Sequence, residues 1–146
     1  MRGSLLSYVL VTIQFGALGV IAVTGPWFGH TPALLAVQAI GVAVALWAIT
    51  SIPARNLRIL PDVPTGALFV RRGPYHYIRH PMYTGLLLAS LPAVLAGPSP
   101  LRIASWFVLL VDIIVKLHHE ERLLLAAFPE YGAYRSQTKR LIPLIY

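Results

Sequence analysis

Residues 5–52 read LLSYVLVTIQFGALGVIAVTGPWFGHTPALLAVQAIGVAVALWAITSI, and this stretch decides the fold because it contains no Asp, Glu, Lys or Arg. An α-helix needs about 20 apolar residues to cross the hydrocarbon core of a bilayer. Two such helices fit, and we expect them at 5–24 and 33–52. The intervening GPWFGHTP, 25–32, breaks the helix with glycine and proline and carries two aromatic residues that suit a membrane interface.

Two shorter apolar runs follow, at 82–97 and 101–117, with a Gly-Pro-Ser-Pro turn between them. Each corresponds to about 25 Å of helix, which just spans a bilayer or spans it with local thinning. Pro92 is expected to kink the first of them. Only 12% of all residues are charged, whereas a soluble domain has about 25%. The composition therefore predicts a membrane protein.

The remaining segments are polar. Residues 53–79 form a turn-rich connection, longer than a hairpin needs, which is typical of a functional loop. After 117 the chain becomes amphipathic and charged, and Pro129 is expected to end that helix. We predict an all-α, multi-pass bundle of about four spans with a cytoplasmic amphipathic C-terminal helix. It forms one membrane domain, 1–146, made of two spans (1–54), a cytoplasmic loop (55–81), a helical hairpin (82–117) and a C-terminal helix and tail (118–146).

The cations are distributed unevenly about these spans. In a four-span arrangement every Lys and Arg except Arg102 lies on one side. The positive-inside rule then places both termini in the cytoplasm, and we expect a prokaryotic cytoplasmic membrane. Topology thus explains the net charge of +7, and no nucleic-acid partner is predicted.

Ionisable residues continue into the fourth predicted span. Asp112 and Lys116 are four residues apart and are expected to pair, and His119 and Glu120 follow on roughly the same helix face. Polar groups at membrane depth are costly and usually functional. The alternative is an ion pair that only makes insertion tolerable.

A second polar concentration is GPYHYIRHPMYTG, 73–85, directly before the third span. Pro81 suits the first turn of a helix, so Arg79 and His80 would flank a helix N-terminus, which favours anions. Tyr83 follows one turn later, and Gly85 allows close backbone approach. The alternative is a basic, aromatic interfacial anchor.

Several chemistries are disfavoured. The absence of cysteine rules out disulfides, thiolate metal sites and a cysteine nucleophile. His76 and His80 have the spacing of metal ligands, but Pro81 interrupts the helix they would need, so no metal site is predicted. No Ser-His-Asp arrangement, phosphate loop or dinucleotide fingerprint is visible.

The stretch RHPMYTG, 79–85, resembles the RHPxYxG signature of the membrane methyltransferases of the isoprenylcysteine carboxyl methyltransferase and phospholipid methyltransferase group. The preceding GPY at 73–75 fits the same group. A second motif of the group is similar to the residues that follow the hairpin, namely Glu120, Glu121, Leu124, Phe128, Tyr131, Tyr134, Arg140 and Pro143. The resemblance covers about 62–143.

The resemblance implies S-adenosylmethionine as methyl donor, bound at the cytoplasmic ends of the last helices. Its ammonium would pair with Glu120 or Glu121, of which the helical phase predicts Glu120 to be the deeper. Its carboxylate would lie near Arg79, His80 or the helix N-terminus. Tyr83 and Tyr134 are expected to cover the adenine or the sulfonium of the donor, and Gly85 to let the donor approach the backbone closely. Arg140 is expected near the polar head of the acceptor.

The resemblance favours the isoprenylcysteine carboxylate type, so the expected partner is a lipid or prenylated small molecule in the bilayer. Three alternatives stay open: phospholipid N-methylation, a steroid-reductase-like oxidoreductase whose Arg71, Arg72 and Arg79 hold the 2′-phosphate of NADPH, and a membrane subunit without catalytic activity. The oligomeric state is not predicted.

Overall fold

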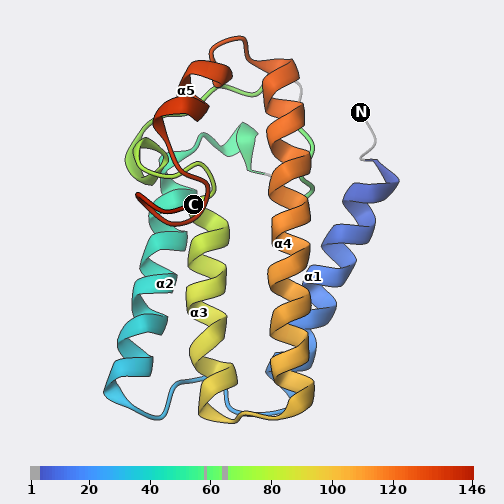
Figure 1. Cartoon of the computed structure of the whole chain (residues 1–146), viewed down its shortest axis with the longest axis vertical. Coiled ribbons are helices and arrows are strands. Elements are labelled where there is room, and N and C mark those ends of the chain that lie inside the picture. Colours follow the sequence, from blue (N-terminus) through green and yellow to red (C-terminus); the bar gives the residue numbers. More distant parts are fainter. Residues whose placement is uncertain (1–3, 58, 64–65) are drawn as a thin grey trace.

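The computed structural model describes residues 4–57, 59–63 and 66–146. Within these residues it is all-helical, without a strand. Its α-helices are α1 (Leu5–Val23), α2 (Pro32–Ser51), α3 (Pro81–Ala96), α4 (Pro100–Ala127) and α5 (Tyr131–Gln137), with two short 3-10 helices, η1 (Ala54–Asn56) and η2 (Gly73–His76). The four long helices form an upright bundle (Figure 1). Short connections close one end, and the long loop, α5 and the C-terminus gather at the other.

Helix starts follow from local sequence. Ser4, Thr31 and Ser99 each accept a hydrogen bond from a backbone N–H in the first turn of α1, α2 and α4. A proline occupies the first turn of α2, α3 and α4, where its missing N–H costs nothing. The helix boundaries therefore lie within a residue or two of those expected, except at the end of α4.

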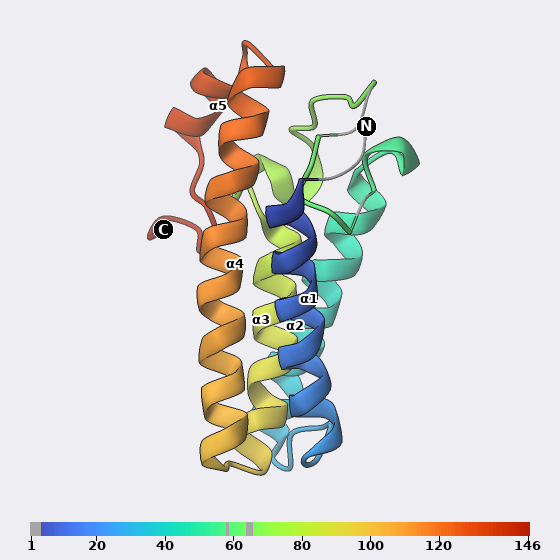
Figure 2. The same ribbon diagram turned by 90° about the vertical axis from the view of Figure 1, so that its right-hand side faces the viewer.

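The helix α4 is one continuous element of 28 residues rather than a span followed by a separate C-terminal helix. No proline or glycine interrupts it between Pro100 and Phe128, so the polar continuation after 117 extends the same helix out of the bundle (Figure 2). The separate C-terminal helix is α5, which is short.

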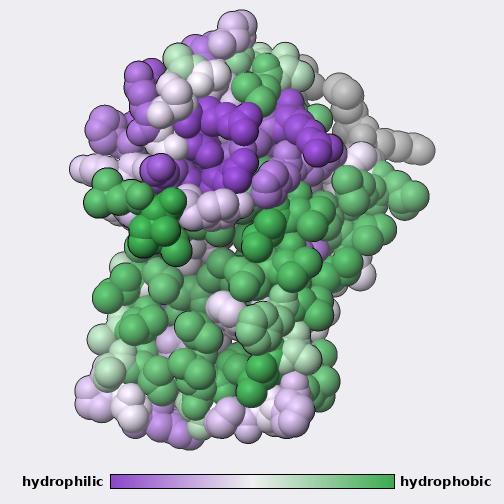
Figure 3. Space-filling model, in the orientation of Figure 1, coloured by the Kyte–Doolittle hydropathy of each residue, from purple (hydrophilic) through white to green (hydrophobic). Residues whose placement is uncertain are grey.

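On the face shown in Figure 3, a broad apolar belt separates two polar ends of unequal size. Two helices, α1 and α2, are long and apolar enough to cross a membrane, and α3 is a shorter apolar helix. The helix α4 is long enough to cross a membrane but is less apolar than α1 and α2. Its first 17 residues include Arg102, Asp112 and Lys116. The fold is that of a membrane helical protein, and a count of four spans remains a prediction.

The helix α3 packs closely on α2, and α1 packs on α4 (Figures 1 and 2). At the first contact Gly85 faces α2: a Cβ on it would lie only 2.7 Å from the carbonyl oxygen of Gly41. At the second, Ala17 of α1 packs on a buried cluster that includes Leu109 and Ile113 of α4. Small residues bring two backbones together in a membrane, where lipid is as apolar as the helices themselves.

The expected pair of Asp112 and Lys116 is wrong. Lys116 Nζ donates instead to Gln14 Oε1 of α1 at 2.6 Å. Neither carboxylate oxygen of Asp112 has a hydrogen-bond partner among the described residues, although the residue is buried. The reason is tertiary: α1 packs against this face of α4 and supplies a competing acceptor.

Arg102, in the first turn of α4 at the opposite end of the bundle, is fully enclosed. Its guanidinium donates to the carbonyl oxygens of Ile21 at 2.6 Å, Pro26 at 3.0 Å and Ala93. These carbonyls lie near the ends of α1 and α3 and in the turn after α1, where helix geometry leaves acceptors unpaired. The arginine therefore ties the turn between α1 and α2 to the turn between α3 and α4.

Candidate active site

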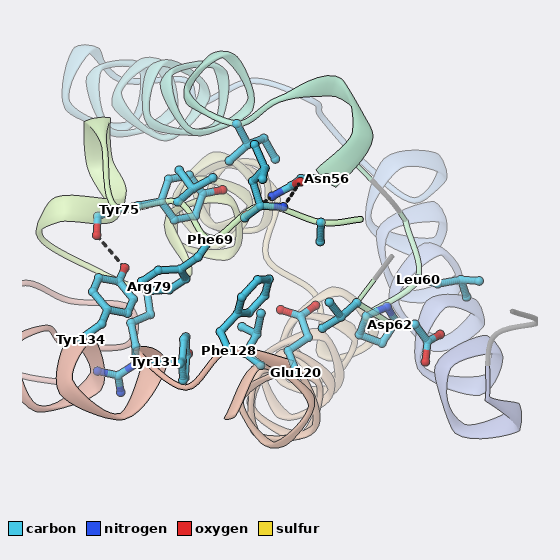
Figure 4. A pocket seen from close by; sticks show the side chains of 17 residues that line it. Asn56, Leu60, Asp62, Phe69, Tyr75, Arg79, Glu120, Phe128, Tyr131 and Tyr134 are labelled. Carbon is cyan, nitrogen blue, oxygen red and sulfur yellow. Dashed lines mark hydrogen bonds between the residues drawn. The ribbon is translucent and has the colours of Figure 1, made fainter. Parts of the chain in front are cut away.

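A cavity of about 180 Å³ opens at the polar end of the bundle, between the long loop and the last turns of α4 (Figure 4). Its walls come from four parts of the chain: the end of α2 with η1, the loop, the approach to α3, and the segment from α4 to α5. The lining residues are Ile52, Asn56, Leu60, Pro61, Asp62, Val63, Ala67, Leu68, Phe69, Val70, Tyr75, Arg79, Glu120, Leu124, Phe128, Tyr131 and Tyr134.

Aromatic rings form one wall of this cavity. The ring of Phe69, from the loop, lies 5.2–6.0 Å from the rings of Phe128, Tyr131 and Tyr134. Asn56 holds the loop in place, since its side chain accepts from the N–H of Leu68 at 3.0 Å and donates to its carbonyl at 2.6 Å. The long loop is thus folded onto the C-terminal segment.

The Glu120 carboxylate is directed into the cavity (Figure 4). One oxygen accepts a hydrogen bond from the Tyr83 hydroxyl, and the other lies 3.4 Å from His80 Nδ1. His80 and Tyr83 stack with their rings 5.7 Å apart. Among the described residues, no Arg or Lys lies within ion-pair distance of this carboxylate. Glu120 therefore faces the cavity with Tyr83 and His80, and not an arginine or lysine, as its side-chain partners in the described structure.

Glu121 is in the opposite situation. Its carboxylate lies 2.6 Å from Arg79 Nε, 3.3 Å from Arg140 Nε and 3.8 Å from Arg135 Nε. Its side chain is 4% exposed, against 20% for Glu120, so the expectation that Glu120 is the deeper of the two is wrong. The chain after α5 folds back over Glu121 and covers it, which helical phase alone does not reveal.

This returning chain runs beside the approach to α3. The N–H groups of Arg79 and His80 donate to the carbonyls of Lys139 and Arg140 at 2.8 and 3.0 Å, and the Thr84 hydroxyl donates to the carbonyl of Leu141 at 2.7 Å. The Arg79 guanidinium also donates to the carbonyls of Arg135 and Thr138. The two motifs therefore form one hydrogen-bonded unit at the N-terminus of α3.

Charge sets the protonation states within this unit. Burial alone would raise the pKa of the Glu121 carboxyl, but contacts with His80 and Arg79 hold that pKa at about 2. Burial alone would lower the pKa of the His80 imidazole, but Glu120 and Glu121 raise it above its usual value of 6.5. Both shifts favour a charged network of opposite signs.

The predicted site residues fall into three groups. Glu120, Arg79 and Tyr134 line the cavity, and His80 and Tyr83 contact Glu120. Glu121 and Arg140 lie together outside the cavity lining, with Arg140 also bonded to the Tyr146 hydroxyl at 3.1 Å. Gly85 is buried against α2, so its close approach is to a neighbouring helix.

The sequence reasoning missed part of the cavity wall. Asp62 lines it with one oxygen buried and without a hydrogen-bond partner in the described part of the chain. Asn56 and Phe69 also contribute. The available signal was the length and aromatic content of the loop. These features indicated a functional loop but not which of its residues line the cavity with Glu120.

These features define a membrane helical protein with a polar, carboxylate-bearing cavity at one end of its bundle. Residues 30–131 match the sequence model of the phospholipid methyltransferase family. The matched range exceeds half of the chain, and the chain belongs to this family of membrane methyltransferases.

The chain is also similar to the cobalt-zinc-cadmium resistance protein CzcN of Cupriavidus metallidurans. The two are 30% identical over 146 aligned positions, which cover 94% of this chain and 59% of CzcN. The chain thus spans less than two thirds of that relative's length. Family members typically use S-adenosylmethionine, which agrees with the donor implied by the motifs.

Proposed function

We propose that this protein transfers a methyl group from S-adenosylmethionine to the polar head of an amphiphilic acceptor in the bilayer. The observation that carries the proposal is the Glu120 carboxylate, which faces an aromatic-walled cavity without an arginine or lysine bonded to it in the described structure. Such a carboxylate is suited to a cationic ligand.

The residues present fit this donor. S-adenosylmethionine supplies an electrophilic methyl group on a sulfonium. Glu120 offers carboxylate oxygens to the donor's positive groups, and the rings of Phe69, Tyr131 and Tyr134 offer flat apolar faces to its adenine or sulfonium. The cavity residues would then align the donor and exclude water, which is where most of the rate acceleration of a direct displacement arises.

The acceptor type depends on Arg79 and Arg140, which we propose act near the donor carboxylate and the acceptor head. Arg140 retains contact with solvent, with its side chain 19% exposed. A carboxylate acceptor, as in isoprenylcysteine methylation, would be oriented by its planar guanidinium. An amine acceptor, as in phospholipid N-methylation, would be repelled. Assays of the wild type and Arg140→Lys with a prenylcysteine analogue and with phosphatidylethanolamine distinguish these substrates, since lysine lacks the planar fork.

The two glutamates provide the sharpest test of the donor site. We expect Glu120→Gln to weaken the binding of S-adenosylhomocysteine about 10- to 100-fold, the scale of a charge-assisted hydrogen bond, with little change in melting temperature. Glu121→Gln should instead destabilise the fold by about 3 kcal/mol or more, because it leaves the buried Arg79 guanidinium without its counter-ion. Isothermal titration and thermal unfolding in detergent measure the two effects.

Glu130→Gln is the matched control, since Glu130 is exposed and outside the cavity lining. Unchanged affinity in a folded Glu120→Gln protein would contradict the donor site. Titration with NADPH tests the oxidoreductase alternative directly. In the structure Arg79 bonds Glu121, Arg72 bonds the carbonyl of Ser51 through Nε, and Arg71 bonds the Gln137 side chain. Each guanidinium has five N–H donors, so the titration decides between the two cofactors.

A further inference from the structure

The helix α1 ends before the matched range begins at residue 30, yet one polar contact joins it to the candidate site. Gln14 Oε1 of α1 accepts from Lys116 Nζ of α4 at 2.6 Å. Lys116 is 2% exposed and lies one helical turn before Glu120. An ammonium so enclosed within a membrane bundle is costly unless its partners are well placed.

The second partner of Lys116 is Tyr83. The ammonium lies 5.6 Å from the centre of the Tyr83 ring, a cation–π distance. The hydroxyl of the same tyrosine donates to Glu120. A continuous series of contacts therefore leads from Gln14 through Lys116 and Tyr83 to the carboxylate in the cavity.

Lys116 also has a partner that it does not use. Asp112 lies one turn away on the same helix, within reach of an i, i+4 ion pair. Both of its oxygens are buried and have no hydrogen-bond partner within the described residues. The ammonium therefore lies beside Gln14 and Tyr83 and makes no hydrogen bond to Asp112.

We propose that Gln14 and Lys116 are positioning residues for Glu120. Gln14 holds the Lys116 ammonium over the Tyr83 ring, and the ring, held in this way, directs its hydroxyl at Glu120 and sets the orientation of that carboxylate. Asp112 is the competing partner that draws Lys116 away when Gln14 is lost. The inference rests on the proposed role of Glu120 in donor binding, and it extends the site to a helix outside the matched range.

The first test is donor affinity. We expect Gln14→Leu to weaken S-adenosylhomocysteine binding about 3- to 30-fold, the usual range of coupling between contacting residues, without a matching fall in melting temperature. Gln14→Glu, which keeps an acceptor for the ammonium, should bind as the wild type does. Gln38→Leu is the matched control, because Gln38 is also a glutamine in an apolar helix but bonds Trp27 and Gly29 at the far end.

The decisive variant is the double one. Adding Asp112→Asn to Gln14→Leu removes the competing charge, so Lys116 returns to Tyr83 and most of the lost affinity is restored. A merely structural role for Gln14 predicts the reverse, since a second substitution in the same contact region would weaken the protein further.

The second test needs no donor. The chain has only two lysines, Lys116 and Lys139, so isotope labelling of lysine side chains gives two NMR signals. We expect a ring-current shift for Lys116 that Tyr83→Leu and Gln14→Leu abolish and the double variant restores, with Lys139 as internal reference. A Lys116 signal unmoved by Gln14→Leu would overturn the proposal, as would Gln14→Leu binding the donor analogue like the wild type. Failure of the wild type to bind the analogue would overturn the proposed function instead, and with it the role of the contact series in donor binding.

Discussion

At the scale of single residues, Glu121 and His80 make stability depend on pH in opposite directions. The pKa of Glu121 falls from 4.5 to about 2 on folding, so its contribution is complete above pH 4.5 and is lost as pH falls from 4.5 toward 2. The pKa of His80 is raised, so its contribution is complete below pH 6.5 and is lost as pH rises through the raised value. We expect the melting temperature in detergent to be highest between pH 4.5 and 6.5.

Variants at these two residues test the two sides of this pH dependence, which are coupled because His80 and Glu121 shift each other's pKa. Glu121→Gln should reduce the fall in melting temperature below pH 4.5, and His80→Gln should reduce the fall in melting temperature above pH 6.5. His30→Gln is the control, because His30 is exposed in the turn between α1 and α2. If the melting temperature of His80→Gln still falls as pH rises above 6.5, another group is responsible for that loss of stability.

At the scale of elements, the contact of α2 with α3 depends on the absence of side chains. A Cβ on Gly85 would lie 2.7 Å from the backbone nitrogen of Ala45, and neither backbone can move without separating the helices. Gly85→Ala should therefore destabilise the protein by about 1–3 kcal/mol, the usual cost of overpacking. Gly16→Ala is the matched control, because nothing lies within 4 Å of a Cβ at Gly16.

The control is expected to be neutral or slightly stabilising, since alanine is the better helix former. Unfolding midpoints in a denaturing detergent series measure both variants. Equal effects of the two substitutions would contradict the close packing of α2 against α3 at Gly85.

At the scale of the whole molecule, charge distribution predicts orientation. The larger polar end of the bundle (Figure 3) carries the cavity, and Arg102 is the one cation predicted at the other end. We propose that the bundle spans the membrane four times with both termini in the cytoplasm. Because the chain lacks cysteine, single cysteines at Thr31 and Ser136 mark the two ends.

In intact cells, a membrane-impermeant maleimide should label Thr31→Cys and not Ser136→Cys, and lysis should expose the second. The cysteine-free wild type is the labelling control. Labelling of Ser136→Cys in intact cells would reverse the orientation and place the cavity outside the cytoplasm.

The apolar runs predicted α1, α2 and α3 closely, because a span must satisfy its own backbone hydrogen bonds and its length is set by the bilayer. The chain's family was also evident from the spacing of RHPMYTG and the glutamate pair. The prediction failed where partners came from distant segments. Lys116 bonds Gln14 rather than Asp112, and Glu121 rather than Glu120 is the more buried glutamate.

The sequence by itself thus determined the class of fold, the family and the residues with reactive side chains, since these depend on local hydropathy and short motifs. Only the tertiary structure decided which partners and how much burial those residues have. The chain after α5 returns to the start of α3, where Arg140 joins Arg79 in pairing with Glu121, while Glu120 faces the cavity. The physical reason is that charge and burial depend on which segments meet, and two adjacent glutamates on one helix acquire different environments only when other elements pack around them.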